Sequence, residues 1–403
     1  MNRLIRCTSA VTMLFLLALL AACGSSSSSA TPAAGVTRTI FIAAEDMDWD
    51  YGNNTGTNQL TGVPLADDPD APTFTERVTF SSISSAVTAG TKTPADVRIG
   101  STYKKTLYVE YTDATFTTKK PVPPEWQHLG ALGPIIRAEV GDTIKITFMN
   151  KTVTGRSFTM HPHGVFYDKS SEGAPYVSGD PSAFTAGNSV APGSAFTYTW
   201  EVPERAGPGP ADGPSIMWMY HSHVNEPQDE NTGLVGPMIV YKKGDMKPVG
   251  ATGIDREFVV MFKVHDENDS FHLNDNLLAA GLSQAQIDAV NAAGGFDPEA
   301  NLMHGMNGYI YGNIPLATIT MKKGEKVRWY LMAMGTEVDL HTPHWHGNTV
   351  LTMGGMRSDV LDLLPAQMVM ADMVPDNPGT WLFHCHVNDH IKAGMIARYK
   401  VDP

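Results

Sequence analysis

The sequence predicts an all-β protein made of two similar β-barrel domains. Short apolar segments, many with alternating polar residues, are separated by Gly, Pro and Asp turns. The chain contains 37 glycines and 27 prolines, which favours turn-rich sheets over helices. The two halves also repeat the same motifs in the same order, which indicates a duplicated unit. Together these observations predict two Greek-key β-barrel domains.

The expected strands fall into two series. The first covers residues 41–49, 105–113, 141–150, 196–203 and 236–243, and the second covers 257–268, 317–334, 367–374, 379–386 and 395–401. An alanine-rich insertion in the second series predicts a helix over 277–293. The stretch 244–254 is the expected boundary, giving a first domain at 40–245 and a second at 255–403.

The N-terminus predicts an exported lipoprotein. Arg3 and Arg6 precede an apolar run that is too short to span a membrane as a mature helix. The run ends in Leu-Ala-Ala-Cys at 20–23, which resembles the lipobox of bacterial lipoproteins. That resemblance implies a signal peptide at 1–22, lipidation of Cys23 and a flexible tether at 23–39. The protein would then lie in the bacterial cell envelope, held to the membrane only by its lipid; an ordinary signal peptide is the alternative.

Charge argues against one class of partner. The net charge is −13 and the basic residues are scattered, so nucleic acid is not an expected partner.

One cysteine remains in the body of the protein. Cys7 would leave with the signal peptide and Cys23 would carry the lipid, so Cys385 cannot form an internal disulfide. A lone thiol in an oxidising compartment indicates a metal ligand. His384 and His386 flank Cys385, and His390 and Met395 follow it. Thiolate, imidazole and thioether with one further His is the ligand set of a blue-copper site.

Histidines gather in four short motifs. Ten of the 14 histidines lie in HPH, HSH, HTPHWH and HCHVNDH, two motifs in each half. Alternate residues of a strand project to one face, so each pair can contribute to one metal cluster. Four such pairs repeated across the two halves predict a metal centre.

The motifs LHTPHWHGN and WLFHCHVNDHIKAGM resemble those of multicopper oxidases of the two-domain kind. The second half is especially similar to ceruloplasmin-type ferroxidases, and the resemblance covers nearly all of residues 40–403. It implies two cupredoxin-like domains and four coppers in each functional unit: one type 1, one type 2 and two type 3.

The same resemblance implies the copper ligands. Type 1 copper would be held by His341, Cys385, His390 and Met395. The trinuclear cluster would be held by His161, His163, His221, His223, His344, His346, His384 and His386, with His161 and His344 on the type 2 copper. The first half would have no type 1 copper, because the corresponding positions are Phe158, Ser222, Pro227 and a loop near Leu234.

The implied reaction is one-electron oxidation of a substrate at type 1 copper, coupled to four-electron reduction of dioxygen to water. Electrons would pass from Cys385 to His384 and His386. Glu172 has the spacing of the acidic residue that supplies protons in this family, and Glu226 and Asp229 are weaker candidates.

The substrate expectation depends on a second set of residues. Glu299, His304 and Asp389 match the iron-binding pattern of ceruloplasmin-type ferroxidases, and hard oxygen ligands suit Fe(II). Phenol oxidation, as in laccases, and Cu(I) oxidation are the alternatives. The many methionines of the second half could recruit Cu(I), although core packing explains them better.

Each chain offers half of a cluster from each domain, and in related two-domain proteins such halves meet between subunits. The resemblance therefore implies a head-to-tail homotrimer with clusters between subunits, with six domains like ceruloplasmin. A monomer that closes the cluster within one chain is the alternative. A copper nitrite reductase would instead have its blue copper in the first domain and only three histidines at its second copper. A copper-binding lipoprotein without catalytic activity remains a third class.

Overall fold

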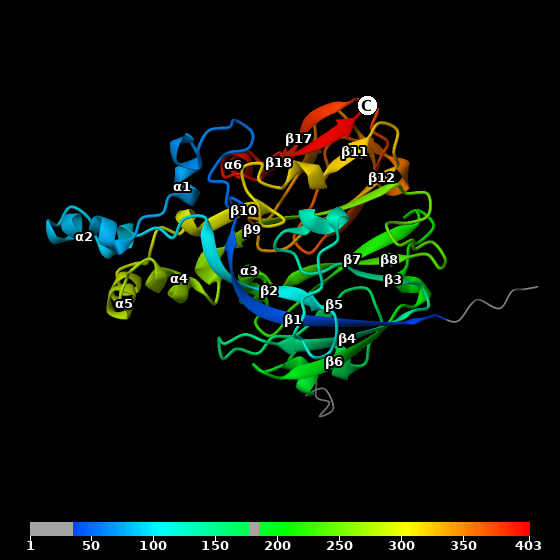
Figure 1. The fold of residues 1–403 in the computed structure, drawn as a ribbon, viewed down its shortest axis with the longest axis horizontal. Coiled ribbons are helices and arrows are strands. Elements are labelled where there is room, and N and C mark those ends of the chain that lie inside the picture. The colour runs from blue at the N-terminus through cyan, green and yellow to red at the C-terminus, as the bar shows by residue number, and fades with distance from the viewer. Residues whose placement is uncertain (1–34, 177–184) are drawn as a thin grey trace, which may run out of the picture. The chain divides into compact units, whose positions relative to one another are not determined.

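The structure, a computed structural model, describes residues 35–176 and 185–403, which contain four β-sheets and a few short helices (Figure 1). The predicted signal peptide, Cys23 and most of the expected tether lie outside the described residues. The first strand begins at Thr37, so the last residues of the expected tether belong to a sheet. No described helix is long and apolar enough to cross a membrane.

Two sheets take all their strands from the first half of the chain. One has the order β2-β1-β4-β6 and the other β3-β8-β7-β5. Their bounds are β1 Thr37–Asp50, β2 Thr102–Tyr111, β3 Ile136–Glu139, β4 Thr143–Asn150, β5 His161–Pro162, β6 Ala195–Glu201, β7 Ser215–His221 and β8 Val235–Tyr241.

The other two sheets take their strands from the second half. Their orders are β10-β9-β12-β16-β14-β15 and β11-β18-β17-β13. The strands are β9 Arg256–Asp266, β10 Leu302–Met306, β11 Thr320–Lys322, β12 Val327–Ala333, β13 Pro343–Trp345, β14 Val350–Leu351, β15 Arg357–Ser358, β16 Met368–Met373, β17 Gly379–Cys385 and β18 Ile396–Asp402.

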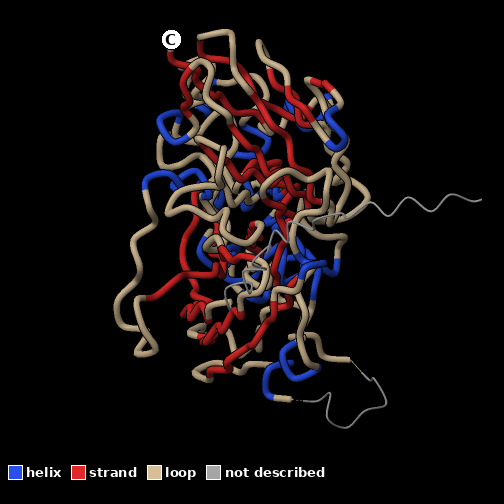
Figure 2. Tube along the Cα trace, turned by 90° about the vertical axis from the view of Figure 1, so that its right-hand side faces the viewer, coloured by secondary structure: helices blue, strands red, loops and turns tan. Residues whose placement is uncertain are grey.

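The sequence repeat is a repeat of sheet topology. The order β2-β1-β4-β6 matches β10-β9-β12-β16, and β3-β8-β7-β5 matches β11-β18-β17-β13. The parallel pairs also correspond, since β1–β4 matches β9–β12 and β3–β8 matches β11–β18. The predicted mainly β, cupredoxin-like fold is confirmed, and Figure 2 shows how short the helices are among strands and loops. The domain boundary at 245–255 stays a prediction.

Helices lie in connections between strands. Their bounds are α1 Pro72–Thr75, α2 Phe80–Thr88, α3 Glu226–Thr232, α4 Leu273–Ala279, α5 Gln284–Ala292 and α6 Asn388–Lys392. The single helix predicted at 277–293 is wrong, because the chain turns between α4 and α5. Gly281 has a left-handed backbone with φ +94°, and Ser283 starts α5 with a capping box to Gln286. The helices α1, α2, α3 and α6 were not predicted.

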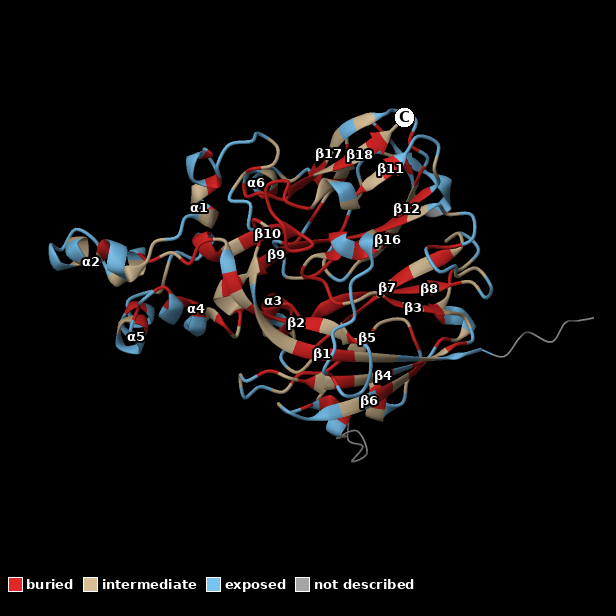
Figure 3. Ribbon diagram, in the orientation of Figure 1, coloured by how far each residue is buried: buried red, intermediate tan, exposed pale blue. Residues whose placement is uncertain are grey.

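Apolar side chains between the sheets are buried, whereas only Ile83 of α2 and only Ile287 and Val290 of α5 are buried (Figure 3). The two halves are also joined by a buried ion pair. Lys105 of β2 contacts Glu267 after β9, both side chains are fully buried, and Tyr51 donates a hydrogen bond to Glu267 at 2.5 Å. The carbonyl oxygen of Asn231 accepts a second bond from Lys105. These contacts hold β2 of the first half against the segment that follows β9 in the second half.

Candidate metal centres

Three side chains converge at the end of β17. The Cys385 Sγ lies 3.5 Å from Nδ1 of His390 and 3.9 Å from Nδ1 of His341. The two Nδ1 atoms are 3.2 Å apart, and all three residues are buried. One thiol and two imidazole nitrogens therefore face a common point at which they could hold a metal ion.

Neighbouring groups fix the orientation of this triad. The carboxylate of Asp339 accepts a hydrogen bond from Nε2 of His341 at 3.2 Å, which leaves the lone pair of Nδ1 directed at the cysteine. Burial alone would raise the pKa of Asp339, but the bond from His341 and the charge of Lys263 lower it below its ordinary value. The backbone N–H of Thr342 donates to the Cys385 sulfur at 3.4 Å.

Burial also sets the protonation of the ligands. It lowers the pKa of His390 to about 4, with help from His341 and His304, so the imidazole is neutral near pH 7. Burial raises the pKa of the Cys385 thiol, so metal binding there must release a proton. Met395 is fully buried, and its backbone carbonyl accepts the N–H of Cys385 at 3.1 Å.

Four histidine rings meet at the first-half site. Strand β5 pairs with β7 so that His161 lies opposite His221, and the Nε2 atoms of His163 and His221 are 3.2 Å apart. His223 lies with its ring centroid 5.1 Å from that of His161. Burial lowers the pKa of His163 to about 4, so its ring is neutral and can act as a ligand.

The second-half site repeats this arrangement. His344 of β13 lies opposite His384 of β17, and the Nε2 atoms of His346 and His384 are 3.0 Å apart. The His386 ring centroid lies 5.4 Å from that of His344.

Backbone carbonyls orient the rings in the same way at both sites. Nδ1 of His221 donates to the carbonyl of Ser222 at 3.1 Å, and Nδ1 of His384 donates to that of Cys385 at 2.6 Å. His161 and His344 donate to carbonyls in the following loops, those of Glu172 and Asp359, at 2.7 and 3.1 Å. Each of these bonds leaves Nε2 available to a metal.

The two histidine sets remain separate in one chain. Among the described residues, no ring contact and no group of potential metal ligands joins a histidine of the first set to a histidine of the second. Each set therefore holds four of the eight predicted cluster ligands.

A hydrogen-bond network occupies the first-half position that corresponds to the triad. Ser222 stands in place of the cysteine, accepts the N–H of Thr159 at 3.0 Å and donates to Asp229 at 2.6 Å. The N–H of Ser222 bonds to the carbonyl of Leu234, as that of Cys385 bonds to Met395. Phe158 is fully buried and packs 6.0 Å from the ring of Phe271. These side chains offer neither a thiolate nor an imidazole.

The predicted proton donor and its alternatives lie near the first set. The carboxylate of Glu172 contacts Lys169 and Tyr176, whereas its backbone carbonyl contacts His161. Glu226 contacts His223 at 3.2 Å. Asp229 is buried, with its pKa raised to about 6 by burial.

Sequence reasoning did not single out Glu230. It is buried 3.8 Å from Nδ1 of His221, and burial raises its pKa to about 7. Glu230 forms a potential ligand group with His221 and Glu226. The signal in the sequence is its four-residue spacing from Glu226, which puts both carboxylates on one face of α3.

The three residues predicted to bind iron differ in their burial and in their contacts with the triad. His304 of β10 is buried with its ring 5.3 Å from that of His390, and the negative charge of Asp389 acts on it. Asp389 and Glu299 are exposed. No group of three potential ligands among the described residues combines Glu299, His304 and Asp389.

Three further histidines have structural surroundings. His128, His265 and His272 are buried, and His128 accepts the backbone N–H of Val259 through Nε2 at 3.0 Å.

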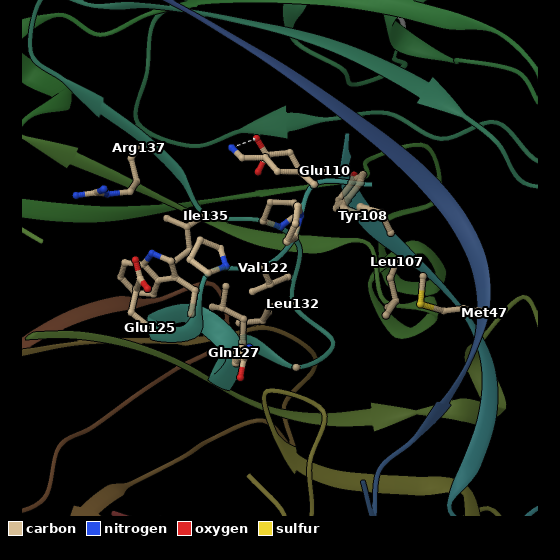
Figure 4. Close-up of a pocket in the computed structure, with 18 of the residues that line it drawn as sticks. Met47, Leu107, Tyr108, Glu110, Val122, Glu125, Gln127, Leu132, Ile135 and Arg137 are labelled. Carbon is tan, nitrogen blue, oxygen red and sulfur yellow. Dashed lines mark hydrogen bonds and ion pairs between the residues drawn. The ribbon is translucent and has the colours of Figure 1, made fainter. Parts of the chain in front are cut away.

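A pocket of 490 Å³ opens between β2 and the loop over 120–137 (Figure 4). Its lining includes Tyr108, Trp126 and Arg137 but no histidine or cysteine, so it is separate from the predicted metal centres.

The donor atoms fit copper. The triad supplies one soft thiolate and two imidazoles, and each histidine set supplies imidazoles, two of which bring their Nε2 atoms together. Asp339 belongs to this centre although sequence reasoning missed it. The available signal was an acid two residues before His341, in keeping with the carboxylates that orient metal-bound histidines.

Comparison with known proteins gives the same family throughout. Residues 110–245 and 284–403 each match a family described as multicopper oxidase. Mouse hephaestin is 40% identical over 374 residues, covering 92% of this chain and 30% of hephaestin. Human ferroxidase HEPHL1 is 40% identical, covering 91% and 29%, and human ceruloplasmin is 39% identical, covering 90% and 30%. The chain thus spans about 30% of the length of these relatives.

Solved structures agree in fold. A crystal structure described as a multicopper oxidase matches with a TM-score of 0.53 and 18% identity, covering 91% of this chain and 89% of the other. The blue copper oxidase from Nitrosomonas europaea matches with a TM-score of 0.52 and 16% identity, covering 91% and 86%. The predicted family is confirmed: the chain is a ceruloplasmin-like member of the multicopper oxidase family.

Proposed function

We propose that the protein is an oxidase that takes single electrons from a reduced substrate, with Fe(II) favoured, and uses four of them to reduce dioxygen to water. The observation that carries the proposal is the placement of Cys385 at the end of β17, directly after His384 of that strand and directly before His386. The cysteine belongs to the buried triad, and His384 belongs to the second histidine set. One strand therefore connects the two centres.

The proposed ligands are those of the predicted pattern. His341, Cys385, His390 and Met395 would hold type 1 copper, and the eight histidines of the two sets would hold the type 2 and type 3 coppers. Bound copper would supply one-electron redox chemistry at the first centre and dioxygen reduction at the second. The covalent backbone between Cys385 and His384 joins the two centres. The hydrogen bond from Nδ1 of His384 to the Cys385 carbonyl, at 2.6 Å, provides a second short path between them.

We propose a homotrimer in which the first histidine set of one subunit meets the second set of the next. The separation of the two sets within one chain supports this arrangement. A head-to-tail contact that uses both faces of every subunit closes into a ring. Attachment to the bacterial cell envelope through a lipid on Cys23 is part of the same proposal.

The protons for water formation would come through an acidic residue beside the first set. Glu172 is the candidate with family spacing, and its carbonyl holds the ring of His161 at 2.7 Å. Tyr176 and Lys169 keep its carboxylate in a polar environment from which a proton can be exchanged with solvent.

Fe(II) is the favoured substrate because His304 lies against His390 and because exposed carboxylates belong to Asp389, directly before His390, and to Glu299, five residues before His304. The names of the matched relatives, which include ferroxidases, support the same choice. Phenols and Cu(I) remain alternative substrates.

The test is oxygen uptake by copper-loaded protein with Fe(II), Cu(I) or a phenol. We compare wild type with the combined variant Glu299→Ala, His304→Ala and Asp389→Ala. The Fe(II) rate should fall at least about tenfold in the variant, with smaller changes for the other reductants. Undiminished Fe(II) turnover would rule out the iron site. Cys385→Ser is the control for electron entry, and it should abolish both the blue absorption band and turnover with every reductant.

A further inference from the structure

Two insertions from different halves of the chain form a helical lobe, defined here as residues 51–101 and 273–301. The N–H of Phe80 bonds to the carbonyl of Ala280 at 2.9 Å, and Arg77 bonds to the carbonyl of Ala279. Apolar side chains of both insertions share one buried cluster. The lobe is therefore packed as a unit, and Figure 1 shows α1 on its side nearest β10 and α6.

The lobe reaches the buried triad through one aromatic side chain. Phe74 of α1 lies edge-to-face against His304, with ring centroids 5.6 Å apart. His304 lies 5.3 Å from His390, and His390 lies 5.0 Å from His341. Four rings thus lie in series from the lobe to the triad.

The exposed fractions of the four side chains show that these rings are covered from solvent. Phe74 is 8% exposed, His304 and His390 are each 6% exposed, and His341 is 1% exposed. A planar organic molecule consequently has no open imidazole face on which to stack. Asp389, which directly precedes His390, and Glu299, five residues before His304, are in contrast exposed.

We propose that Phe74 is a specificity-determining residue that shields His304 and His390 from aromatic reductants while a small metal cation can still approach through the carboxylates. The inference rests on the proposed function, in which electrons enter at the Cys385 triad. Each Fe(II) would give up one electron and leave as Fe(III), whereas a phenol would give up one electron and one proton. Discrimination arises from blocked contact with the larger substrate.

The test uses Phe74→Ala, with Phe80→Ala as the matched control. Phe80 packs against the same lobe cluster but has no ring contact with His304 among the described residues. The first measurement is the rate at which diethyl pyrocarbonate modifies His304 in metal-free protein, followed by peptide mass spectrometry. The second is the rate at which a phenol or Fe(II), without oxygen, bleaches the blue band of copper-loaded protein.

Phe74→Ala should increase both the modification of His304 and bleaching by phenol at least about tenfold, with Fe(II) bleaching changed less than about threefold. Phe80→Ala should leave all three rates near those of wild type. Either His304 modification or phenol bleaching unchanged in Phe74→Ala would overturn the shielding proposal. If Phe74→Ala does not fold, Phe74→Leu must give smaller increases in the same two rates.

Failure of the proposed function is recognised separately. A copper-loaded wild type without a blue band, or one that no reductant bleaches, would reject electron entry at Cys385. The modification rate of His304 in metal-free protein would then decide by itself whether Phe74 shields the ring.

Discussion

Asp339 accepts a hydrogen bond from Nε2 of His341 at 3.2 Å and thereby directs the opposite nitrogen toward Cys385. The same carboxylate accepts the backbone N–H groups of Val264 at 2.6 Å and Thr336 at 2.9 Å. Asp339 is therefore fixed by two backbone hydrogen bonds before any metal binds. This preorganisation lowers the cost of holding the imidazole in its ligand orientation.

Replacing Asp339 with Ala should weaken copper retention at the triad by about 10- to 100-fold, because His341 loses the acceptor that fixes its tautomer. Copper competition with a chelator, followed through the blue band, measures the effect. Asp362→Ala, which removes an exposed acid of the same half, is the control and should retain copper like wild type. Equal copper retention by the two variants would contradict the positioning role.

The proposed subunit arrangement predicts complementation between inactive chains. His163→Ala damages the first set and His346→Ala damages the second, so each variant alone should be inactive. In a head-to-tail trimer every mixed assembly has one intact interface, so about one third of the clusters should be restored in the mixed trimers. Oxygen uptake by co-expressed variants, purified through two different tags, measures the recovery.

The complementation has its own control. Co-expression of His163→Ala with His221→Ala damages the first set in every subunit and should recover nothing. Absence of activity in the His163→Ala and His346→Ala mixture, when co-expressed wild-type chains are active, would show that clusters do not form between subunits.

The buried ion pair between Lys105 and Glu267 predicts a large stability effect. Lys105→Met leaves a fully buried carboxylate without its cation and should lower the free energy of unfolding by about 3–5 kcal/mol. Adding Glu267→Leu should recover part of that loss, because both buried charges are then gone. Chemical denaturation measures these differences.

A surface ion pair that involves the same strand, β2, provides the comparison for the buried ion pair. Lys120 contacts Glu110 at 2.7 Å with half of its side chain exposed, so Lys120→Met should cost no more than about 1 kcal/mol. A single Lys105→Met variant as stable as Lys120→Met would mean that the buried pair does not join the halves as described.

The burial of His128 as a neutral ring predicts that mild acid lowers the stability of the folded protein. Burial lowers its pKa to about 4 from an ordinary value of 6.5, so between these values the unfolded chain binds a proton that the folded chain does not. The contribution of neutral His128 to the free energy of unfolding is therefore fully present above pH 6.5. This contribution is lost as the pH falls toward 4, by about 2 kcal/mol between pH 7 and 5.

The contribution of His128 is isolated by substitution. His128→Gln keeps a side-chain acceptor for the N–H of Val259 but does not titrate, so metal-free His128→Gln should show a flatter dependence of unfolding free energy on pH. An identical pH dependence in wild type and variant would contradict the buried neutral state of His128.

Local patterns were sufficient to predict much of the fold and the grouping of ligands. Alternation predicted the long strands, and because alternate side chains share a face, the H-x-H motifs indicated which rings would meet. The structure brings His161 against His221 and His344 against His384 through strand pairing. The break between α4 and α5 was not predicted, because the alanine-rich pattern outweighed the turn signal of Gly281 and Ser283.

Contacts between distant segments could not be read from these patterns. Phe74 meets His304 across 230 positions of sequence, and only packing of the two lobe insertions brings them together. The unpredicted role of Asp339 depends on the backbone N–H of Val264 in β9, which helps to fix its carboxylate. Short strands such as β5 carry too few residues to show periodicity, so the first histidine set was located by its motif and not by its strand.

In the proposed function, one-electron oxidation at the Cys385 triad feeds the four-electron reduction of dioxygen at the histidine sets. The stoichiometry of copper-loaded protein tests this coupling, measured as Fe(II) oxidised against dioxygen consumed, with peroxide assayed in the same vessel. We predict about four Fe(II) per dioxygen and no peroxide. A ratio near two with peroxide released, or no enzyme-dependent oxygen uptake, would contradict the coupling.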